Sequence, residues 1–216
     1  MCIDNFEAIE NNLLEFTPGS YYKFEALIRN TDGENPLYYE GSSNTNKNIL
    51  IKTWWVDSED YYKKIKNEMK VLCDLTGARL YVLLDRMNVK KTLVHMNMKT
   101  EDLILQNYVL GNNEVSAKTV FKVSGTCSSI KDSSDRDKRL WMFDIDSKNF
   151  ELLSAIQDAC YPRKFFTLAT YKGYHVCVFK SGARRQFEPE VTHPILTQFS
   201  SEWSLQECAL GLVYMR

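Results

Sequence analysis

The sequence predicts an α+β protein with a mixed or antiparallel sheet covered by helices. Short apolar runs, rich in β-branched and aromatic residues, alternate with amphipathic patterns of helical period. Two such runs, KFFTLAT and YHVCVFK, are separated only by Tyr-Lys-Gly, a spacing typical of a β-hairpin. The 216 residues are 44% apolar and 25% charged, which is typical of a soluble globular protein.

The first half of the chain mixes predicted helices and strands. Asp4 is a candidate N-cap for the first helix, and Ser58 and Gly77 are the expected start and stop signals of the second. In order, we expect a helix at 4–16, strands at 21–30 and 48–56, a helix after Ser58, a strand at 78–85, a mostly helical stretch at 89–110 and a strand at 113–123.

A polar segment at 128–139, charged in both signs and without a hydrophobic period, is the best candidate for a boundary. We therefore predict an N-terminal lobe at 1–127 and a C-terminal lobe at 139–216, packed together as one compact unit. The predicted elements of the second lobe are a strand at 139–145, a helix at 147–160 with Phe150, Leu153 and Ile156 as its apolar face, the hairpin at 164–180, a helix at 189–199 and a strand at 210–215.

Composition limits the function classes. The net charge of −1 gives no bulk attraction to nucleic acid, so such binding needs local clusters, as at 86–91 and 180–185. The six cysteines form no CxxC pair, and Cys73, Cys160 and Cys177 are expected as reduced core residues. No apolar run approaches the roughly 20 residues of a membrane helix, and the acidic N-terminus lacks the plan of a signal peptide. We expect a cytoplasmic protein without a membrane partner.

Asp144 and Asp146 end the apolar run LWMF and are the first candidate site residues. Side chains two apart on a strand point to the same side, so the two carboxylates would project together. A divalent cation with a preference for oxygen ligands, Mg²⁺ or Mn²⁺, would relieve their repulsion. The alternative is structural: Asp146 caps the following helix and Asp144 lies at an exposed strand end.

His175 opens the strand that follows a glycine turn, and the hairpin is expected to return beside the strand of the aspartates. A histidine there can donate to a phosphate whose metal the carboxylates hold. Four cations are the candidate phosphate-binding residues that accompany His175: Lys172, Lys180, Arg184 and Arg185. A purely structural histidine is the alternative.

The sequence from 140 to 180 resembles the archaeo-eukaryotic-type primases and primase-polymerases. WMFDID looks like their first motif, apolar residues before Asp-x-Asp, and KGYH is similar to their second, a small residue, any residue and His. The resemblance implies that Asp144 and Asp146 bind catalytic metal and that His175 contacts the phosphates of the incoming nucleotide. It also implies nucleotidyl transfer in DNA replication, with nucleotide and nucleic acid as partners.

Two departures from the family pattern concern activity. Gly173 stands where the family usually has Ser, and no aspartate follows His175 to supply the third acidic motif. Glu202 or Glu207 is the nearest substitute by position. We therefore expect metal-dependent binding of nucleotide or nucleic acid, with primer synthesis or extension weak or absent.

Three alternatives remain open at this point. One is a catalytically inactive nucleic-acid- or protein-binding module with a primase-like fold, of mobile-element or phage origin, in which exposed aromatics stack on single strands. The aromatics at 21–24, 53–62 and 163–166 are candidates, although core packing is the commoner role for such residues. A haloacid-dehalogenase-type phosphatase, which also begins with Asp-x-Asp, is the second alternative. A purely structural role is the third.

Overall fold

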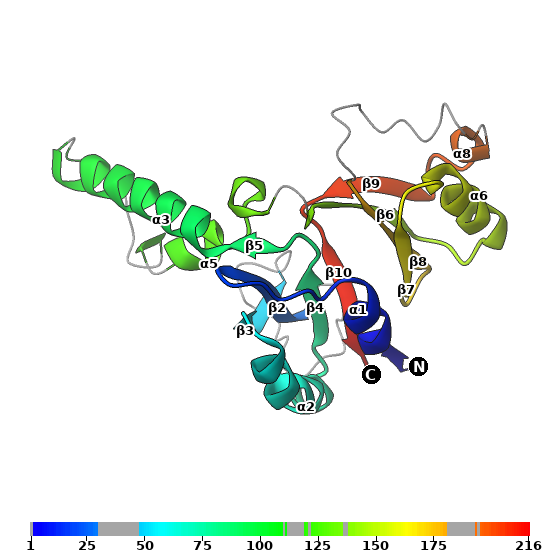
Figure 1. Cartoon of the computed structure of the whole chain (residues 1–216), viewed down its shortest axis with the longest axis horizontal. Helices are drawn as coiled ribbons and strands as arrows, with labels where there is room; N and C mark the ends of the chain where they lie inside the picture. Colours follow the sequence, from blue (N-terminus) through cyan, green and yellow to red (C-terminus); the bar gives the residue numbers. More distant parts are fainter. Residues whose placement is uncertain are drawn as a thin grey trace, which may run out of the picture.

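The protein is built on antiparallel sheets and helices, which confirms the predicted α+β class at this coarse level. The computed structural model describes residues 2–29, 48–109, 111, 119–120, 122–135, 138–180, 193 and 195–216. Within these residues the strands form two sheets (Figure 1). The first contains the strands of the N-terminal half together with the last strand of the chain, and the second contains the remaining strands of the C-terminal half.

The first sheet has the order β1-β10-β4-β2-β3, with β5 also paired to β2, and each of these pairs is antiparallel. Its strand β10 comes from the C-terminal end of the chain and pairs with β4 on one side and β1 on the other. The strands are β1 (Ile3–Asp4), β2 (Ser20–Ile28), β3 (Ile49–Val56), β4 (Arg79–Leu83), β5 (Met87–Asn88) and β10 (Leu210–Met215).

The second sheet has the order β7-β8-β6-β9, and its pairs are also antiparallel. Along the chain, β6 (Leu140–Ile145), α6 (Phe150–Cys160), β7 (Phe165–Ala169), β8 (Tyr174–Phe179), α8 (Ile195–Gln198) and β9 (Trp203–Glu207) follow one another. This is the βαββαβ order of a ferredoxin-like arrangement. Antiparallel neighbours on both sides of β6 disfavour the phosphatase alternative, whose alternating strands and helices would give a parallel sheet.

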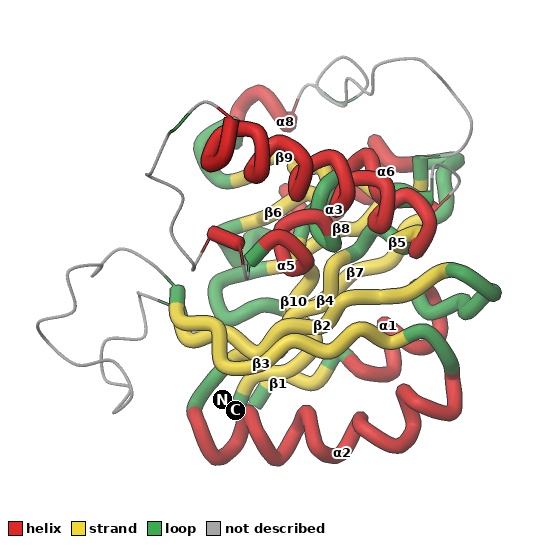
Figure 2. Tube along the Cα trace, turned by 90° about the vertical axis from the view of Figure 1, so that its left-hand side faces the viewer, coloured by secondary structure: helices red, strands yellow, loops and turns green. Residues whose placement is uncertain are grey.

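Helices cover the sheets from several sides. α1 (Phe6–Asn12) and α2 (Glu59–Thr76) pack on the first sheet, and Figure 2 shows α2 on the side of that sheet away from α3 (Val89–Ile104). The predicted limits of α2 are confirmed: the Ser58 side chain accepts from the Tyr61 N–H, and Gly77 ends the helix with a φ of 68°. Short helical segments follow α3 in the described part of the chain. They include the π-helical turn η1 (Leu105–Val109), the α-helix α5 (Val123–Cys127) and the 3-10 turn η2 (Lys131–Ser133).

The two sheets share one hydrophobic core. Met142 and Leu168 of the second sheet belong to the same buried cluster as Leu84 and Val213, which lie beside and within the first. The Asn5 side chain also joins the two parts, because its amide donates to Ala169 O at 2.9 Å and its oxygen accepts from Ala169 N. A second core lies between α6 and the outer face of the second sheet, where Phe143 and Ile145 are fully buried.

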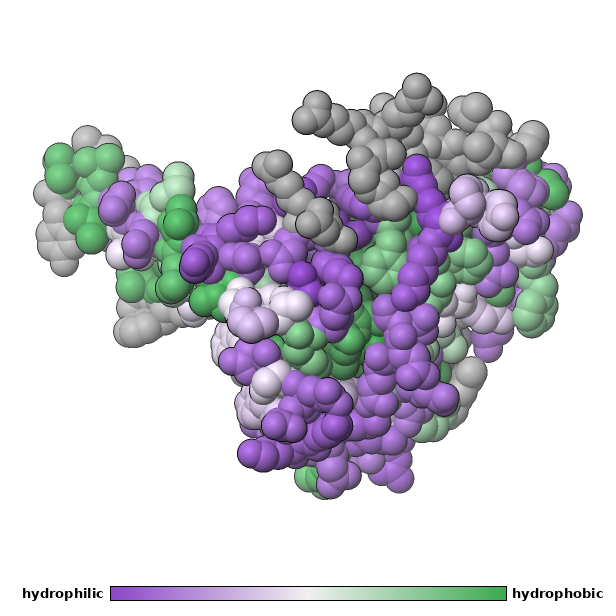
Figure 3. Space-filling view, viewed as in Figure 1, coloured by the Kyte–Doolittle hydropathy of each residue, from purple (hydrophilic) through white to green (hydrophobic). Residues whose placement is uncertain are grey.

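α3 projects from the body of the protein and carries exposed apolar side chains (Figures 1 and 3). The most exposed of these side chains on α3 and η1 are Leu93, Val94, Met98, Ile104 and Val109. Among the described residues, no helix has the length and apolar character needed to cross a membrane.

Several predicted elements require correction. The first helix spans only Phe6–Asn12, because Asp4 belongs to β1 and the chain turns after Asn12. Phe150 does not belong to the apolar face of α6 but is 72% exposed, because the helix begins at this residue and buries Leu152, Ala155 and Ile156 instead. β9 has no counterpart among the strands predicted from the sequence.

Two further predictions lie partly outside the described residues. Of the strand expected at 113–123, residues 113–118 and 121 are not described, and Val123 begins α5 rather than ending a strand. Of the helix expected at 189–199, the described part forms α8.

Candidate functional site

The second sheet brings Asp144 and His175 together. They are direct cross-strand partners of β6 and β8, so their side chains lie on the same face. His175 Nε2 is 3.3 Å from Asp144 Oδ1. Met142 and Cys177, which share this face by alternation, belong to the core that joins the two sheets. The pair therefore lies on the inner face, toward the first sheet.

His175 connects the two sheets. It is buried, and its Nδ1 accepts a long hydrogen bond of 3.5 Å from the backbone N–H of Leu212 in β10. With Nδ1 as an acceptor, the proton of the neutral ring is on Nε2, which donates to Asp144. Both ring nitrogens thus have partners, and the tautomer is fixed by the backbone of the first sheet.

Asp144 is held from both sides. Its Oδ2 accepts from Gln206 Nε2 at 3.2 Å, and Ser204 is its direct cross-strand partner in β9. The hydrogen bond from His175 is the largest influence and lowers the pKa of Asp144, against the opposing effect of burial. The Gln206 hydrogen bond and the positive charge of Arg29 lower it further. The carboxylate, with 30% of its side chain exposed, therefore stays ionised at the junction of the sheets.

Asp146 lies just past the end of β6 and is exposed. Its backbone N–H donates to Glu202 O at 3.0 Å. It does not cap α6, because Asn149 is the N-cap and accepts from the N–H groups of Glu151 and Leu152. The capping role considered for Asp146 is therefore wrong, and its carboxylate is left to solvent or to a ligand.

Gly173 is required by the close packing of the hairpin turn on this segment. A Cβ at this position would lie 2.1 Å from Ile145 O and 2.4 Å from Ser147 O, closer than any real contact. The turn itself is closed by hydrogen bonds between Thr170 and Gly173. A serine, which the primase pattern usually has here, does not fit this backbone arrangement.

The predicted phosphate-binding cations are not all near His175. Lys172 is exposed in the hairpin turn, three residues before His175. Lys180 follows the far end of β8, about 16 Å along the strand from His175 at 3.3 Å per residue, and pairs with Glu207. Arg184 and Arg185 lie outside the described residues.

Neither glutamate considered as a third acid is placed beside Asp144 by the described contacts. Glu207 accepts hydrogen bonds from Lys131, Lys180 and Trp141, and the two lysines lower its pKa to about 2. Glu202 contacts the Asp146 segment through its backbone. On β9, the positions that face Asp144 are Ser204 and Gln206.

The residues at the junction supply some, but not all, of the ligands that one divalent cation needs. Within the described ranges, no three His, Cys, Asp or Glu side chains are grouped to hold a metal ion. Asp144 offers oxygen ligands at the junction, and Mg²⁺ is commonly held through one or two carboxylates together with substrate phosphates. A second ion would lack a carboxylate of its own, because Gln206 is a neutral amide.

Most of the aromatic residues considered for stacking are core residues. Tyr22, Phe24, Trp54 and Phe166 are buried, as the core interpretation predicts. Cys73, Cys160 and Cys177 are buried free thiols, which confirms their predicted role, and burial raises the pKa of Cys73 and Cys160 to about 12.

Sequence reasoning missed Ser204, Gln206 and Arg29 as site residues. No motif marks them: Ser204 and Gln206 are placed by the register of β9, and Arg29, just after β2, acts on Asp144 through its charge. Comparison of the chain with protein-family models, with curated proteins and with solved structures gave no match.

Proposed function

We propose that this protein binds the phosphates of a nucleotide or nucleic acid at the junction of its two sheets, in the manner of a primase-polymerase-type nucleotidyltransferase with reduced catalytic capacity. Asp144, Asp146 and His175 are the proposed recognition residues, and Lys172 is the nearest proposed cation. The observation that carries the proposal is the cross-strand pair of Asp144 and His175, 3.3 Å apart.

Several features support this proposal over a structural role for the pair. Asp144 remains partly exposed, with 30% of its side chain accessible, so a ligand can reach its carboxylate. The exposed Asp146 follows two residues later and has no capping role. A partly open carboxylate next to a histidine of fixed tautomer can accept a cation and present a donor to an anion.

In the proposed site, Asp144 and Asp146 would hold one Mg²⁺ or Mn²⁺, which would neutralise phosphate charge. Once the cation holds Asp144, His175 would turn its Nε2 proton from Asp144 Oδ1 to a phosphate oxygen, because its Nδ1 is occupied by the Leu212 N–H. Ser204 would be a neutral donor beside Asp144. Efficient transfer needs both the attacking and the leaving oxygen stabilised, and Gln206 supplies no charge for a second ion.

The test measures binding and activity separately. Calorimetry with a nucleoside triphosphate and Mn²⁺ should show metal-dependent binding that Asp144→Asn and His175→Ala each weaken by about tenfold, the value of one charge-assisted hydrogen bond. His95→Ala, on α3, and Asp60→Asn, on α2, are matched controls that should leave binding unchanged. Primer extension should be weak or absent.

Two outcomes would contradict the proposal. If no nucleotide binds with or without Mn²⁺, the junction is not a phosphate site, and the protein is better described as a binding or structural module. If brisk extension occurs and is lost in Asp146→Ala, the reduced catalytic capacity is wrong and the site is a full transferase.

A further inference from the structure

A second polar cluster lies at the end of the second sheet where β6 begins, on the other face from Asp144. Trp141 is three residues before Asp144 on β6, so the two side chains point to opposite faces. We define the Trp141 platform as this indole with the charged groups around it: Lys131, Arg139, Arg163, Lys180 and Glu207.

Two cations lie against the indole. Lys180 Nζ is 4.8 Å and Arg163 Cζ is 5.1 Å from the centre of the Trp141 ring. Trp141 is only half-buried and is not part of the core under α6, in contrast to Phe143 two residues later. Both cations have long, rotatable side chains, so a flat ligand would reach the ring by displacing them.

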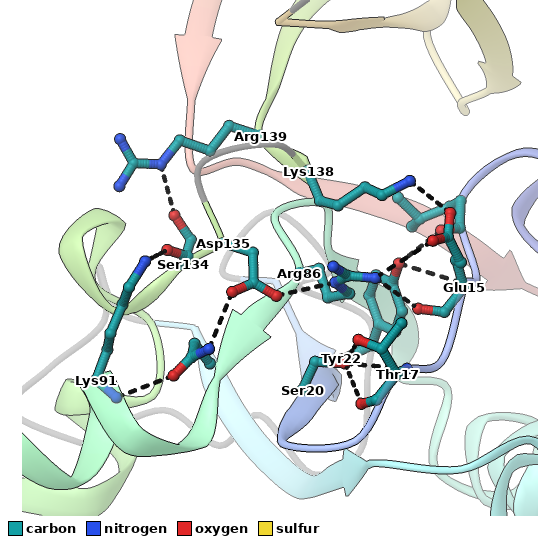
Figure 4. Close-up of polar contacts among 12 residues, drawn as sticks. Glu15, Thr17, Ser20, Tyr22, Arg86, Lys91, Ser134, Asp135, Lys138 and Arg139 are labelled. Carbon is teal, nitrogen blue, oxygen red and sulfur yellow. Dashed lines mark hydrogen bonds and ion pairs between the residues drawn. The ribbon is translucent and has the colours of Figure 1, made fainter.

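The platform has an excess of positive charge. Glu207 accepts from both Lys131 and Lys180, so one carboxylate serves two ammonium groups; the carboxyl group of Asp85, whose pKa burial raises, also attracts Lys180 and Arg139. The Arg139 guanidinium donates to neutral oxygens, Ser134 Oγ and Lys131 O, both at 2.7 Å. The neighbouring cations Arg86 and Lys138 differ, because Figure 4 shows them engaged with Glu15 and Asp135. The defined set therefore has four cations and one carboxylate.

An aromatic ring among cations fits a chain of alternating flat rings and phosphates. Bases stack on aromatic side chains, and Lys and Arg neutralise the phosphates that flank each base. Tyr161, which is 81% exposed and two residues before Arg163 in the same turn, offers a second ring. A purely acidic partner would use the cations but leave both rings without a role.

We propose that the Trp141 platform binds single-stranded nucleic acid, with a base stacked on Trp141 and its flanking phosphates held by Lys180 and Arg163. Lys131 and Arg139 extend the phosphate track along the edge of the sheet. This surface does not depend on the Asp144–His175 site, from which it is separated by the sheet itself.

The experiment measures the fluorescence anisotropy of a labelled single-stranded oligonucleotide of about 12 nucleotides, within the usual site sizes. The buffer contains a chelator and no added metal, so the metal-dependent binding proposed for Asp144 and His175 does not contribute. Trp141→Ala should weaken binding about fivefold or more, and Trp141→Phe should retain most of it, since a ring remains. Arg163→Gln should weaken binding and flatten its salt dependence by about 0.7 in the log–log slope. Lys63→Gln, on α2, is the control and should change nothing.

Glu207→Gln is expected to increase oligonucleotide affinity, a result that misfolding could not produce. The amide keeps an acceptor for Trp141 Nε1 but removes the carboxylate that neutralises Lys131 and Lys180, so oligonucleotide affinity should rise. Unchanged affinity in both Trp141→Ala and Glu207→Gln would overturn the proposal. So would a polyglutamate of equal charge that binds as tightly as the oligonucleotide, because the rings would then have no part.

Discussion

Asp144 and His175 form a hydrogen-bonded pair across two neighbouring strands, and the same histidine accepts from the backbone of Leu212 in the other sheet. The pair thus joins β6 and β8 of the second sheet to β10, which belongs to the first sheet although it comes from the C-terminal end of the chain. Because the contact involves an ionised carboxylate at a partly buried position, it should contribute to folding as well as to ligand binding.

A double-mutant cycle should detect this coupling. In metal-free buffer, Asp144→Ala and His175→Ala should together cost less than the sum of their separate effects, with a coupling energy of about 1 kcal/mol in the free energy of unfolding. Asp146→Ala is the matched control, because Asp146 is exposed and lies past the strand. Coupling between Asp146 and His175 as large as that of the Asp144 pair would show that the cycle reports a general change in the junction.

The hairpin turn should not accept a side chain at position 173. A Cβ there would meet the backbone oxygens of Ile145 and Ser147, which cannot move without distorting β6, so Gly173→Ser should lower the free energy of unfolding by about 3 kcal/mol. Gly125→Ala is the comparison: nothing lies within 4 Å of its Cβ, and alanine in α5 should be neutral or stabilising by up to about 1 kcal/mol. Urea denaturation measures both, and equal effects would contradict the steric explanation.

The sequence predicted local structure better than it predicted long-range neighbours. The strand β6, the hairpin of β7 and β8 and the caps of α2 depend on periodicity and on turn residues close in sequence, and the structure confirms them. The partners of Asp144 in β9 depend on register between segments about 60 residues apart, and no local pattern encodes that register. The spacing of Phe150 predicts a buried position, but the exact start of the helix decides which side a first-turn residue faces.

Asp85 gives the clearest pH dependence. It is 1% exposed, burial raises its pKa, and its Oδ1 accepts from the Leu140 N–H at 2.9 Å. For an acid whose pKa is raised in the folded state, the charged form costs stability above that pKa, and the cost shrinks as the pH falls from the raised pKa toward the ordinary value of 3.8. Asp85→Asn keeps the acceptor oxygen without the charge, so it should stabilise the protein at pH 7, and this gain should shrink as the pH falls.

Asp85→Ala provides the control for the hydrogen bond. Like Asp85→Asn it removes the charge, but it also leaves the Leu140 N–H without its acceptor. Relative to Asp85→Asn, its free energy of unfolding should therefore be lower by about 1 to 3 kcal/mol at every pH. Thermal unfolding of the three proteins between pH 4 and pH 8 checks both effects. A loss of stability in Asp85→Asn at pH 7 would mean that attraction to Lys180 and Arg139 outweighs the cost of burial.

Gln206 is the position at which a third carboxylate would complete the site beside Asp144. Its Nε2 now donates to Asp144 Oδ2 at 3.2 Å, so Gln206→Glu would replace a donor by a second carboxylate of the same shape. Without metal the two carboxylates repel, and the melting temperature should fall. With Mn²⁺ the repulsion becomes attraction to a shared ion, and stabilisation should reach about 2.7 kcal/mol when Mn²⁺ is at 100 times its dissociation constant.

The Mn²⁺-dependent shift should exceed that of the unmodified protein and should vanish in the double variant Asp144→Asn with Gln206→Glu. Gln157→Glu is the matched control, because Gln157 lies on α6, which packs on the other face of the second sheet from Asp144. If Gln206→Glu gains no Mn²⁺ stabilisation, the oxygens of Asp144 are not available to an ion while His175 holds them. The proposed site would then bind phosphate through His175 alone, without metal.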